Sequence, residues 1–180
     1  MPGDLPGGIV ERAARVKLVL YDVDGVLTDG GLYFLGEAGV AVRFSARDGL
    51  GMTIAREAGL LQGIVTRRAM PAVRRRAEEL RLDEIHLGAL EKADTVREIL
   101  ARRGLVGEQC CFVGDDIVDL PALALVGLPV AVADAAEPVR RAAAYVTRAV
   151  GGHGAVREVI ELILGAWGQP FALPQSGGPP

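Results

Sequence analysis

The stretch LVLYDVDGVLTDGG, residues 18–31, places three aspartates directly behind a run of apolar residues. The run belongs to VKLVLYD at 16–22, which is apolar almost throughout and is therefore typical of a strand buried in a parallel sheet. Carboxylates crowded together raise each other's pKa unless a cation offsets their repulsion. This stretch therefore predicts a buried strand that ends in a binding or catalytic site.

The composition indicates a single domain without a nucleic-acid or membrane partner. The 180 residues are 50% hydrophobic but only 4% aromatic, with a net charge of −3 and a pI near 5.5. No apolar run reaches the roughly 18–20 residues of a membrane span, and the N-terminus lacks the pattern of a secretion signal. The two cysteines, Cys110 and Cys111, are adjacent in an apolar run and are expected to be reduced, structural thiols. We therefore expect a cytoplasmic protein.

Strand patterns alternate with helical patterns along the chain, which predicts an α/β fold: a three-layer, doubly wound parallel sheet. Strands are expected at 16–22, 62–66, 84–88, 109–114, 128–132 and 145–147. Helices are expected at 49–58, from Pro71, at 91–103, up to about 125, at 136–143 and at 154–167.

The expected domain organisation has three parts. Residues 1–15 are an N-terminal extension, 16–167 form one domain, and 168–180 are a flexible Pro/Gly-rich tail. Within the domain, 31–45 contains two short extended runs around Gly36–Gly39, which predicts a projecting β-hairpin. No insertion is long enough for a second, cap-like domain.

Polar side chains follow four of the predicted strands, at the edge where ligands bind in parallel sheets. They are Asp22 and Asp24, then Thr66, then Lys92, then Asp115, Asp116 and Asp119. Carboxylate oxygens favour Mg²⁺, and the chain has only two histidines, so a zinc site is not expected. The sequence predicts a Mg²⁺ site at this edge.

These residue types fit phosphoryl transfer. A carboxylate beside Mg²⁺ can attack phosphorus to form an aspartyl-phosphate, and a second one, such as Asp24, can protonate the leaving group. Lys92 supplies positive charge and Thr66 a neutral donor for the phosphoryl oxygens. Gly25 and Gly30 would let backbone approach the phosphate closely, whereas Asp29 is expected only to shape its own turn.

Four elements in order resemble the motifs of the haloacid dehalogenase superfamily of phosphohydrolases: DVDGVLTDG at 22–30, Thr66, Lys92, and GDDIVDLP at 114–121. The resemblance implies that Asp22 is the nucleophile and Asp24 the general acid and base. It also implies Mg²⁺ held by Asp22, the backbone carbonyl of Asp24 and Asp115, with Asp116 and Asp119 in support and Lys92 between nucleophile and phosphate.

Almost the whole chain further resembles the cap-less phosphatases of 3-deoxy-D-manno-octulosonate (KDO) 8-phosphate, through RDGLG at 47–51, LEK at 90–92 and GGHGAVRE at 151–158. That likeness implies hydrolysis of a sugar acid phosphate by a homotetramer in which neighbouring subunits close each other's active sites. The substrate-contacting positions it implies are Asp24, Arg47, Asp48, Gly49, Thr53, Arg68, Arg76 and Lys92.

Two departures from that family keep other substrates open. The chain reads Thr66-Arg67-Arg68 where relatives usually have a glycine in the middle, and His153 stands where a lysine is frequent. The alternatives are a phosphatase for a nonulosonate 9-phosphate or another small sugar phosphate. Outside this enzyme class, the alternatives are a receiver-like phospho-aspartate signalling domain and a catalytically inactive assembly subunit.

Overall fold

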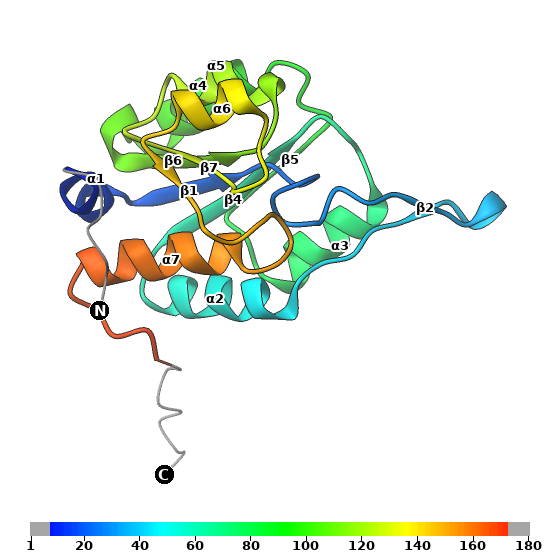
Figure 1. Ribbon diagram of the computed structural model, residues 1–180, viewed down its shortest axis with the longest axis horizontal. Coiled ribbons are helices and arrows are strands. Elements are labelled where there is room, and N and C mark those ends of the chain that lie inside the picture. The colour runs from blue at the N-terminus through cyan, green and yellow to red at the C-terminus, as the bar shows by residue number, and fades with distance from the viewer. Residues whose placement is uncertain (1–7, 173–180) are drawn as a thin grey trace, which may run out of the picture.

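A six-stranded parallel sheet forms the centre of the protein in a computed structural model, which describes residues 8–172 (Figure 1). The strand order is β5-β4-β1-β6-β7-β8. The strands are β1 (Leu18–Tyr21), β4 (Leu61–Thr66), β5 (Glu84–Leu87), β6 (Cys110–Gly114), β7 (Leu128–Ala131) and β8 (Tyr145–Val146). The predicted doubly wound α/β fold is therefore confirmed.

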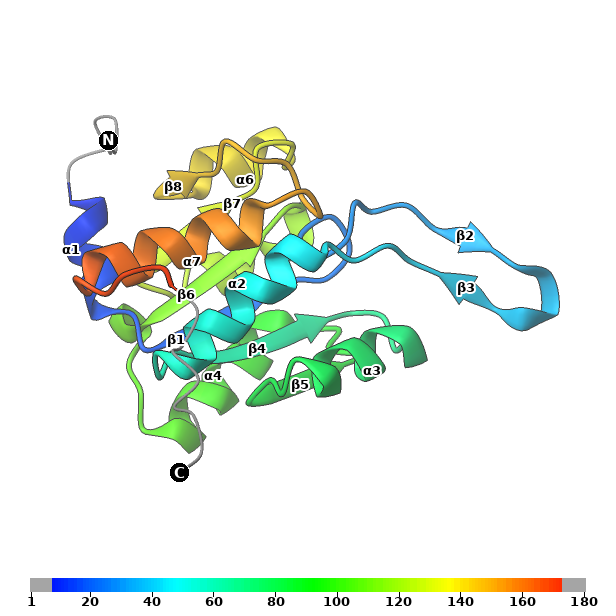
Figure 2. The ribbon, with the colours of Figure 1, turned by 90° about the horizontal axis from the view of Figure 1, so that it is seen from below.

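Helices cover both faces of this sheet (Figures 1 and 2). One face carries α2 (Ala46–Glu57), α3 (Pro71–Glu79) and α7 (Ala155–Ala166), and the other carries α4 (Lys92–Arg103), α5 (Leu120–Leu123) and α6 (Glu137–Ala142). Short 3₁₀ turns lie at Gly36–Ala38, Gly107–Gln109 and Ile117–Asp119. This three-layer arrangement explains why β1, with all four residues buried, is continuously apolar rather than alternating.

The core lies between the central strands and the two helical layers. In β1 and β6 every residue is buried, and the two strands pair from Leu18 opposite Cys110 to Tyr21 opposite Val113. Both cysteine thiols are free and buried, as expected. The largest fully buried side chains are Tyr21, Phe112, Leu18, Leu20, Met52, Leu60, Ile64, Ile99, Leu128, Ile160, Ile163 and Leu164.

The expected hairpin projects from one end of the molecule (Figure 2). Its strands, β2 (Tyr33–Phe34) and β3 (Val40–Ala41), form a separate antiparallel pair. Three consecutive apolar side chains on it are largely exposed: Tyr33 at 54%, Phe34 at 76% and Leu35 at 55%. Within residues 8–172, no further domain lies between the elements of the sheet, so the chain has no cap domain in the part described.

Both ends of the described chain add contacts that the sequence did not indicate. Helix α1 (Ile9–Arg15), inside the expected N-terminal extension, buries Ile9 and Ala13 and packs against α7. In the expected tail, the Phe171 ring lies 3.8 Å from the guanidinium carbon of Arg157. Across residues 8–172, no helix is both long and apolar enough to cross a membrane.

Helix α2 begins at Ala46, three residues before the start expected from the sequence. The Ser45 hydroxyl accepts a hydrogen bond from the Asp48 backbone N–H at 3.2 Å and so caps the helix. The glycines at 49 and 51 weakened the helical pattern in the sequence, but the cap and the packing of α2 on α7 outweigh them.

Truncation of a buried leucine should lower the free energy of unfolding much more than truncation of an exposed leucine. Leu20 is completely buried in β1 and Leu90 is 66% exposed. We expect Leu20→Ala to lower the free energy of unfolding by about 2–5 kcal/mol and Leu90→Ala by less than about 0.5 kcal/mol. Urea unfolding measures both, and equal losses would contradict this assignment of the core.

Candidate active site

The candidate site lies where the winding of the sheet changes direction. The chain runs from β1 outward to β4 and β5, and then returns to β6 on the other side of β1. Ligand sites in open α/β sheets form at such a switch point, beyond the carboxyl ends of the strands. Asp22 directly follows β1, and Asp115 directly follows β6.

A pocket of about 450 Å³ opens at this edge. It is lined by Asp22, Asp24, Gly25, Gly30, Thr66, Arg67, Arg68, Lys92, Asp115, Asp116 and Val118. The predicted catalytic and metal-ligating residues are thus brought together from four separate segments. Arg67, singled out in the sequence only as a departure from the family pattern, and Val118, for which the sequence carries no signal, also line the pocket.

The segment after β1 is folded tightly around Thr28. The Thr28 hydroxyl donates to the Val23 carbonyl at 3.2 Å and accepts from the N–H groups of Gly25 and Gly30 at 3.4 and 3.3 Å. These bonds define the β1 loop, residues 23–30, which carries Asp24. At its end the Asp29 carboxylate accepts from the Gly31 N–H at 3.1 Å, which confirms its predicted role in the turn.

Lys92 is the central charge of the site. It begins α4 and is buried, and its Nζ lies 2.8 Å from Asp22 Oδ1 and 2.5 Å from Asp119 Oδ1. Burial alone would lower the pKa of this ammonium, but the two carboxylates outweigh burial and raise the pKa above its ordinary value. Lys92 is therefore held in its charged form beside Asp22.

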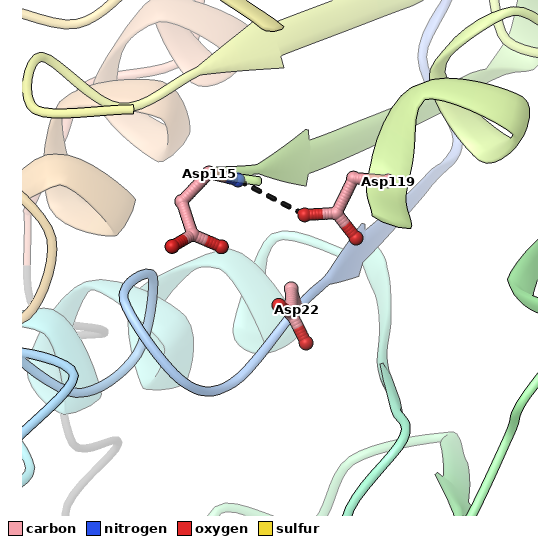
Figure 3. Close-up of side chains that lie close together, drawn as sticks. All are labelled: Asp22, Asp115 and Asp119. Carbon is pink, nitrogen blue, oxygen red and sulfur yellow. Dashed lines mark hydrogen bonds between the residues drawn. The ribbon is translucent and has the colours of Figure 1, made fainter. Parts of the chain in front are cut away.

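Asp119 is completely buried and pairs with Lys92. Figure 3 shows that Asp119 also lies beside Asp115, at the end of β6. Its Oδ2 accepts hydrogen bonds from the backbone N–H groups of Asp115 and Asp116, at 3.0 and 3.3 Å. Asp116 uses its own carboxylate to accept from the Ile117 N–H at 2.7 Å. Asp119 and Asp116 thus shape this turn, while the carboxylate of Asp115 points toward Asp22.

Burial and mutual repulsion disfavour the ionised forms of these carboxyl groups. Burial raises the pKa of Asp22 to about 6; Asp119 adds to the rise and Lys92 opposes it. Burial, together with Asp22 and Asp119, raises the pKa of Asp115 to about 8. A single ammonium therefore does not compensate these three acids, and further positive charge would stabilise their ionised forms.

The arrangement of oxygen atoms fits a divalent cation. Asp22, Asp115 and Asp119 each offer a carboxylate oxygen, and these oxygens lie within 4.8 Å of one another. Asp115 Oδ1 and Asp24 Oδ1 are buried and have no hydrogen-bond partner among the described residues. An unsatisfied buried carboxylate oxygen is costly, and a hard cation such as Mg²⁺ accepts such ligands. The residues therefore fit the predicted metal.

Two arginines complete the pocket. Arg68 Nε lies 3.8 Å from Asp24 Oδ2, and the Arg68 N–H donates to the Thr66 hydroxyl at 3.3 Å. Arg67 is exposed and has no ion-pair partner in the described part of the chain. The pocket thus presents cationic groups from Lys92 and both arginines above the carboxylates, as binding of a phosphate requires.

Several residues implied by the family resemblance lie away from this pocket in the single chain. Arg47, Asp48, Gly49, Thr53 and Arg76 are absent from its lining. Asp48 is buried and accepts backbone N–H groups of α7, and Arg76 pairs with Glu79 at 3.0 Å. His153 lies outside the lining as well, with its Nε2 3.3 Å from Arg43. Their contacts with substrate stay a prediction, because none of them lines this pocket in a single chain.

Comparison with known proteins identifies the class of protein. A family model of haloacid dehalogenase-like hydrolases matches residues 82–160. A 3-deoxy-D-manno-octulosonate 8-phosphate phosphatase of Haemophilus influenzae is 38% identical over 93% of this chain and 93% of its own length.

Solved structures agree in fold and in sequence. The crystal structure of the Yersinia pestis 3-deoxy-D-manno-octulosonate 8-phosphate phosphatase aligns with a TM-score of 0.88 at 39% identity, over 91% of this chain and 88% of that one. The Moraxella catarrhalis enzyme, in complex with magnesium ion, phosphate ion and KDO, aligns with a TM-score of 0.86 at 35% identity, over 89% and 92%.

The chain is thus a phosphatase of the haloacid dehalogenase-like hydrolase class. Within that class, it belongs to the family of 3-deoxy-D-manno-octulosonate 8-phosphate phosphatases.

Without a divalent cation, ionisation of Asp115 should destabilise the fold. Its folded pKa of about 8 exceeds the ordinary value of 3.8, so the folded state binds more protons between these values and stability falls as the pH rises through them. We expect Asp115→Asn in EDTA to be more stable than the natural protein at pH 8, with the difference shrinking toward pH 5. Urea midpoints measure this, and a difference independent of pH would contradict it.

Proposed function

We propose that the protein hydrolyses 3-deoxy-D-manno-octulosonate 8-phosphate to KDO and phosphate in a Mg²⁺-dependent reaction, with Asp22 as the nucleophile. The observation that carries the proposal is the placement of Lys92. Its ammonium lies 2.8 Å from Asp22, at the base of a pocket that also presents oxygens of Asp24 and Asp115 without a hydrogen-bond partner among residues 8–172. A charged lysine there keeps Asp22 available as an anion and provides a contact for the phosphoryl group.

In the first step, a carboxylate oxygen of Asp22 attacks phosphorus and the bond from phosphorus to the ester oxygen breaks. Asp24, two residues along the same loop, donates its proton to the departing alkoxide. Lys92, the Thr66 hydroxyl and backbone N–H groups of the pocket stabilise the phosphoryl oxygens. The products of this step are the free sugar acid and an aspartyl-phosphate on Asp22.

In the second step, the Asp24 carboxylate takes a proton from water, which attacks the phosphorus of the aspartyl-phosphate. The bond to Asp22 breaks, inorganic phosphate is released, and both aspartates return to their starting states. Bound Mg²⁺, held by Asp22, Asp115 and the Asp24 backbone carbonyl, would offset negative charge on the carboxylates and the phosphoryl oxygens. Asp116 and Asp119 hold the turn that presents Asp115.

The proposed substrate rests on the relatives and on the charges of the pocket. The Moraxella catarrhalis structure contains magnesium, phosphate and KDO in an enzyme 35% identical to this chain. A sugar acid phosphate carries a carboxylate besides its phosphate, and Arg67 and Arg68 lie at the pocket as potential partners for it. A nonulosonate 9-phosphate shares both groups and is the alternative substrate.

Asp22→Asn should abolish turnover, because an amide cannot form the aspartyl-phosphate. We expect phosphate release from KDO 8-phosphate with Mg²⁺ to fall at least about a thousandfold, the range reached when a catalytic nucleophile is removed. The same assay should also be run with a nonulosonate 9-phosphate and with a neutral sugar phosphate as substrates. Asp94→Asn, on the exposed surface of α4, is the matched control variant.

Retained activity in Asp22→Asn would overturn the nucleophile assignment. Higher kcat/KM for the nine-carbon or the neutral phosphate would overturn the substrate while leaving the mechanism intact. The two results are therefore separable in one set of assays.

We further propose a cytoplasmic homotetramer in which neighbouring subunits close each other's pockets through the hairpin. The exposed run Tyr33–Leu35 supports this, since adjacent large apolar side chains on a projecting arm favour contact with protein. Closure by a neighbour would also bring side chains such as Arg47 or Arg76 to a pocket that they do not reach in their own subunit. The free thiols of β6 fit a reducing compartment.

Phe34→Asp should disrupt the assembly, because it places a charge in the proposed apolar contact. Sedimentation velocity is expected to give a tetramer for the natural protein and a smaller species for the variant. Val106→Asp, at an exposed position directly before the 3₁₀ turn Gly107–Gln109, should remain tetrameric. A monomeric natural protein, or a tetrameric Phe34→Asp, would refute this assembly.

A further inference from the structure

Asp48 is a buried carboxylate that the proposed chemistry does not use. It lies in the first turn of α2 and is only 2% exposed. Its Oδ2 accepts from the Gly154 N–H at 3.1 Å and its Oδ1 from the Arg157 N–H at 2.8 Å. Both carboxylate oxygens are thus occupied by the N-terminal turn of α7, where free N–H groups and the helix dipole favour a negative charge.

The residues just before α7 form the glycine loop, residues 151–154, which lies directly against the β1 loop. The Gly152 N–H donates to the Val26 carbonyl at 2.9 Å. A Cβ atom on Gly151 would lie 1.7 Å from the Gly25 carbonyl oxygen, and one on Gly152 would lie 2.5 Å from the Asp29 nitrogen. The two loops therefore touch backbone to backbone, and a displacement of one must displace the other.

The β1 loop in turn adjoins the metal-ligating group. A Cβ atom on Gly25 would lie 2.1 Å from Asp115 Oδ2, so the backbone of this loop is in close contact with that carboxylate. The same loop carries Asp24, whose Oδ1, like Asp115 Oδ1, is buried and has no hydrogen-bond partner in the described part of the chain. The position of the β1 loop therefore sets the separation between the oxygens of Asp24 and Asp115.

The glycine loop is held from two sides. Asp48 holds it from α2 through Gly154, and Asp134, between β7 and α6, accepts the Gly151 N–H at 3.0 Å. Close packing supports the first of these contacts, because a Cβ atom on Gly51 of α2 would lie 2.9 Å from Arg157 Cδ.

From these contacts we propose that Asp48 is a positioning residue of the active site: it fixes the glycine loop and, through it, the β1 loop that presents Asp24 beside Asp115. Asp48 acts through backbone and does not touch substrate. This assignment differs from the substrate contact implied by family resemblance. It rests on the proposed function for its effect on turnover, but its effect on metal binding is independent of the substrate.

The test compares Asp48→Asn with the natural protein and with Asp83→Asn. Asparagine keeps the size of the side chain but has one acceptor oxygen, so one N–H of α7 loses its partner. Asp83 is the matched control, since its carboxylate also accepts a backbone N–H, that of Gln62 at 2.9 Å, at the amino end of β4. Calorimetric titration with Mg²⁺ alone, kcat and KM for KDO 8-phosphate, and thermal unfolding are measured for each.

We expect Asp48→Asn to weaken Mg²⁺ binding and to lower kcat by about tenfold each, with KM changed less than about twofold, as happens when groups behind metal ligands are altered. Asp83→Asn should leave both quantities at their natural values. Should Asp48→Asn not fold, Asp134→Asn removes the second support of the same loop and is held to the same criteria.

Two results would overturn the proposal. A lower unfolding temperature with unchanged Mg²⁺ affinity and kcat would make Asp48 a structural cap only. A raised KM with unchanged kcat and Mg²⁺ affinity would make it a substrate contact. If KDO 8-phosphate is not hydrolysed by the natural protein, the proposed function fails, while the Mg²⁺ titration still decides the role of Asp48.

Discussion

The site depends on one buried ammonium held between two buried carboxylates. Lys92 lies within 2.8 Å of Asp22 and 2.5 Å of Asp119, and removing either sign would leave an uncompensated charge in the interior. Asp119 also contacts the end of β6, because its second oxygen accepts a hydrogen bond from the backbone N–H of Asp115. The carboxyl ends of β1 and β6 are thus connected through the buried pair of Lys92 and Asp119.

The same contacts explain why a cluster of acids can be tolerated in a stable fold. Burial, together with the negative charges of Asp22 and Asp119, which Lys92 only partly offsets, raises the pKa of Asp115 to about 8. A bound cation would therefore stabilise the ionised carboxylates. Without the cation, their repulsion lowers the stability of the fold. Glycines at 25, 151 and 152 make this possible, since side chains at these positions would separate the loops that meet there.

Much of the fold and of the residues that line the pocket could be predicted from the sequence. Continuously apolar strands indicate a buried parallel sheet. Polar residues at the strand ends lie close together because the carboxyl ends of parallel strands meet at the same edge. Prediction was less successful for α2, whose start depends on the Ser45 cap, and for α1, which packs against α7. Such contacts join distant segments and leave no periodic pattern behind.

The sequence by itself determined which polar groups meet at one edge of the sheet: Asp22, Asp24, Thr66, Lys92 and Asp115 lie at or after the ends of successive strands, and the common direction of the strands brings them together. Only the tertiary structure decided the partners of each group. The local sequence does not show which groups Asp48 and Asp119 contact. In the structure, Asp48 binds backbone N–H groups at the start of α7, and Asp119 binds Lys92. Those roles depend on distances between helices and loops far apart in the chain, and such distances are set by packing rather than by local residue patterns.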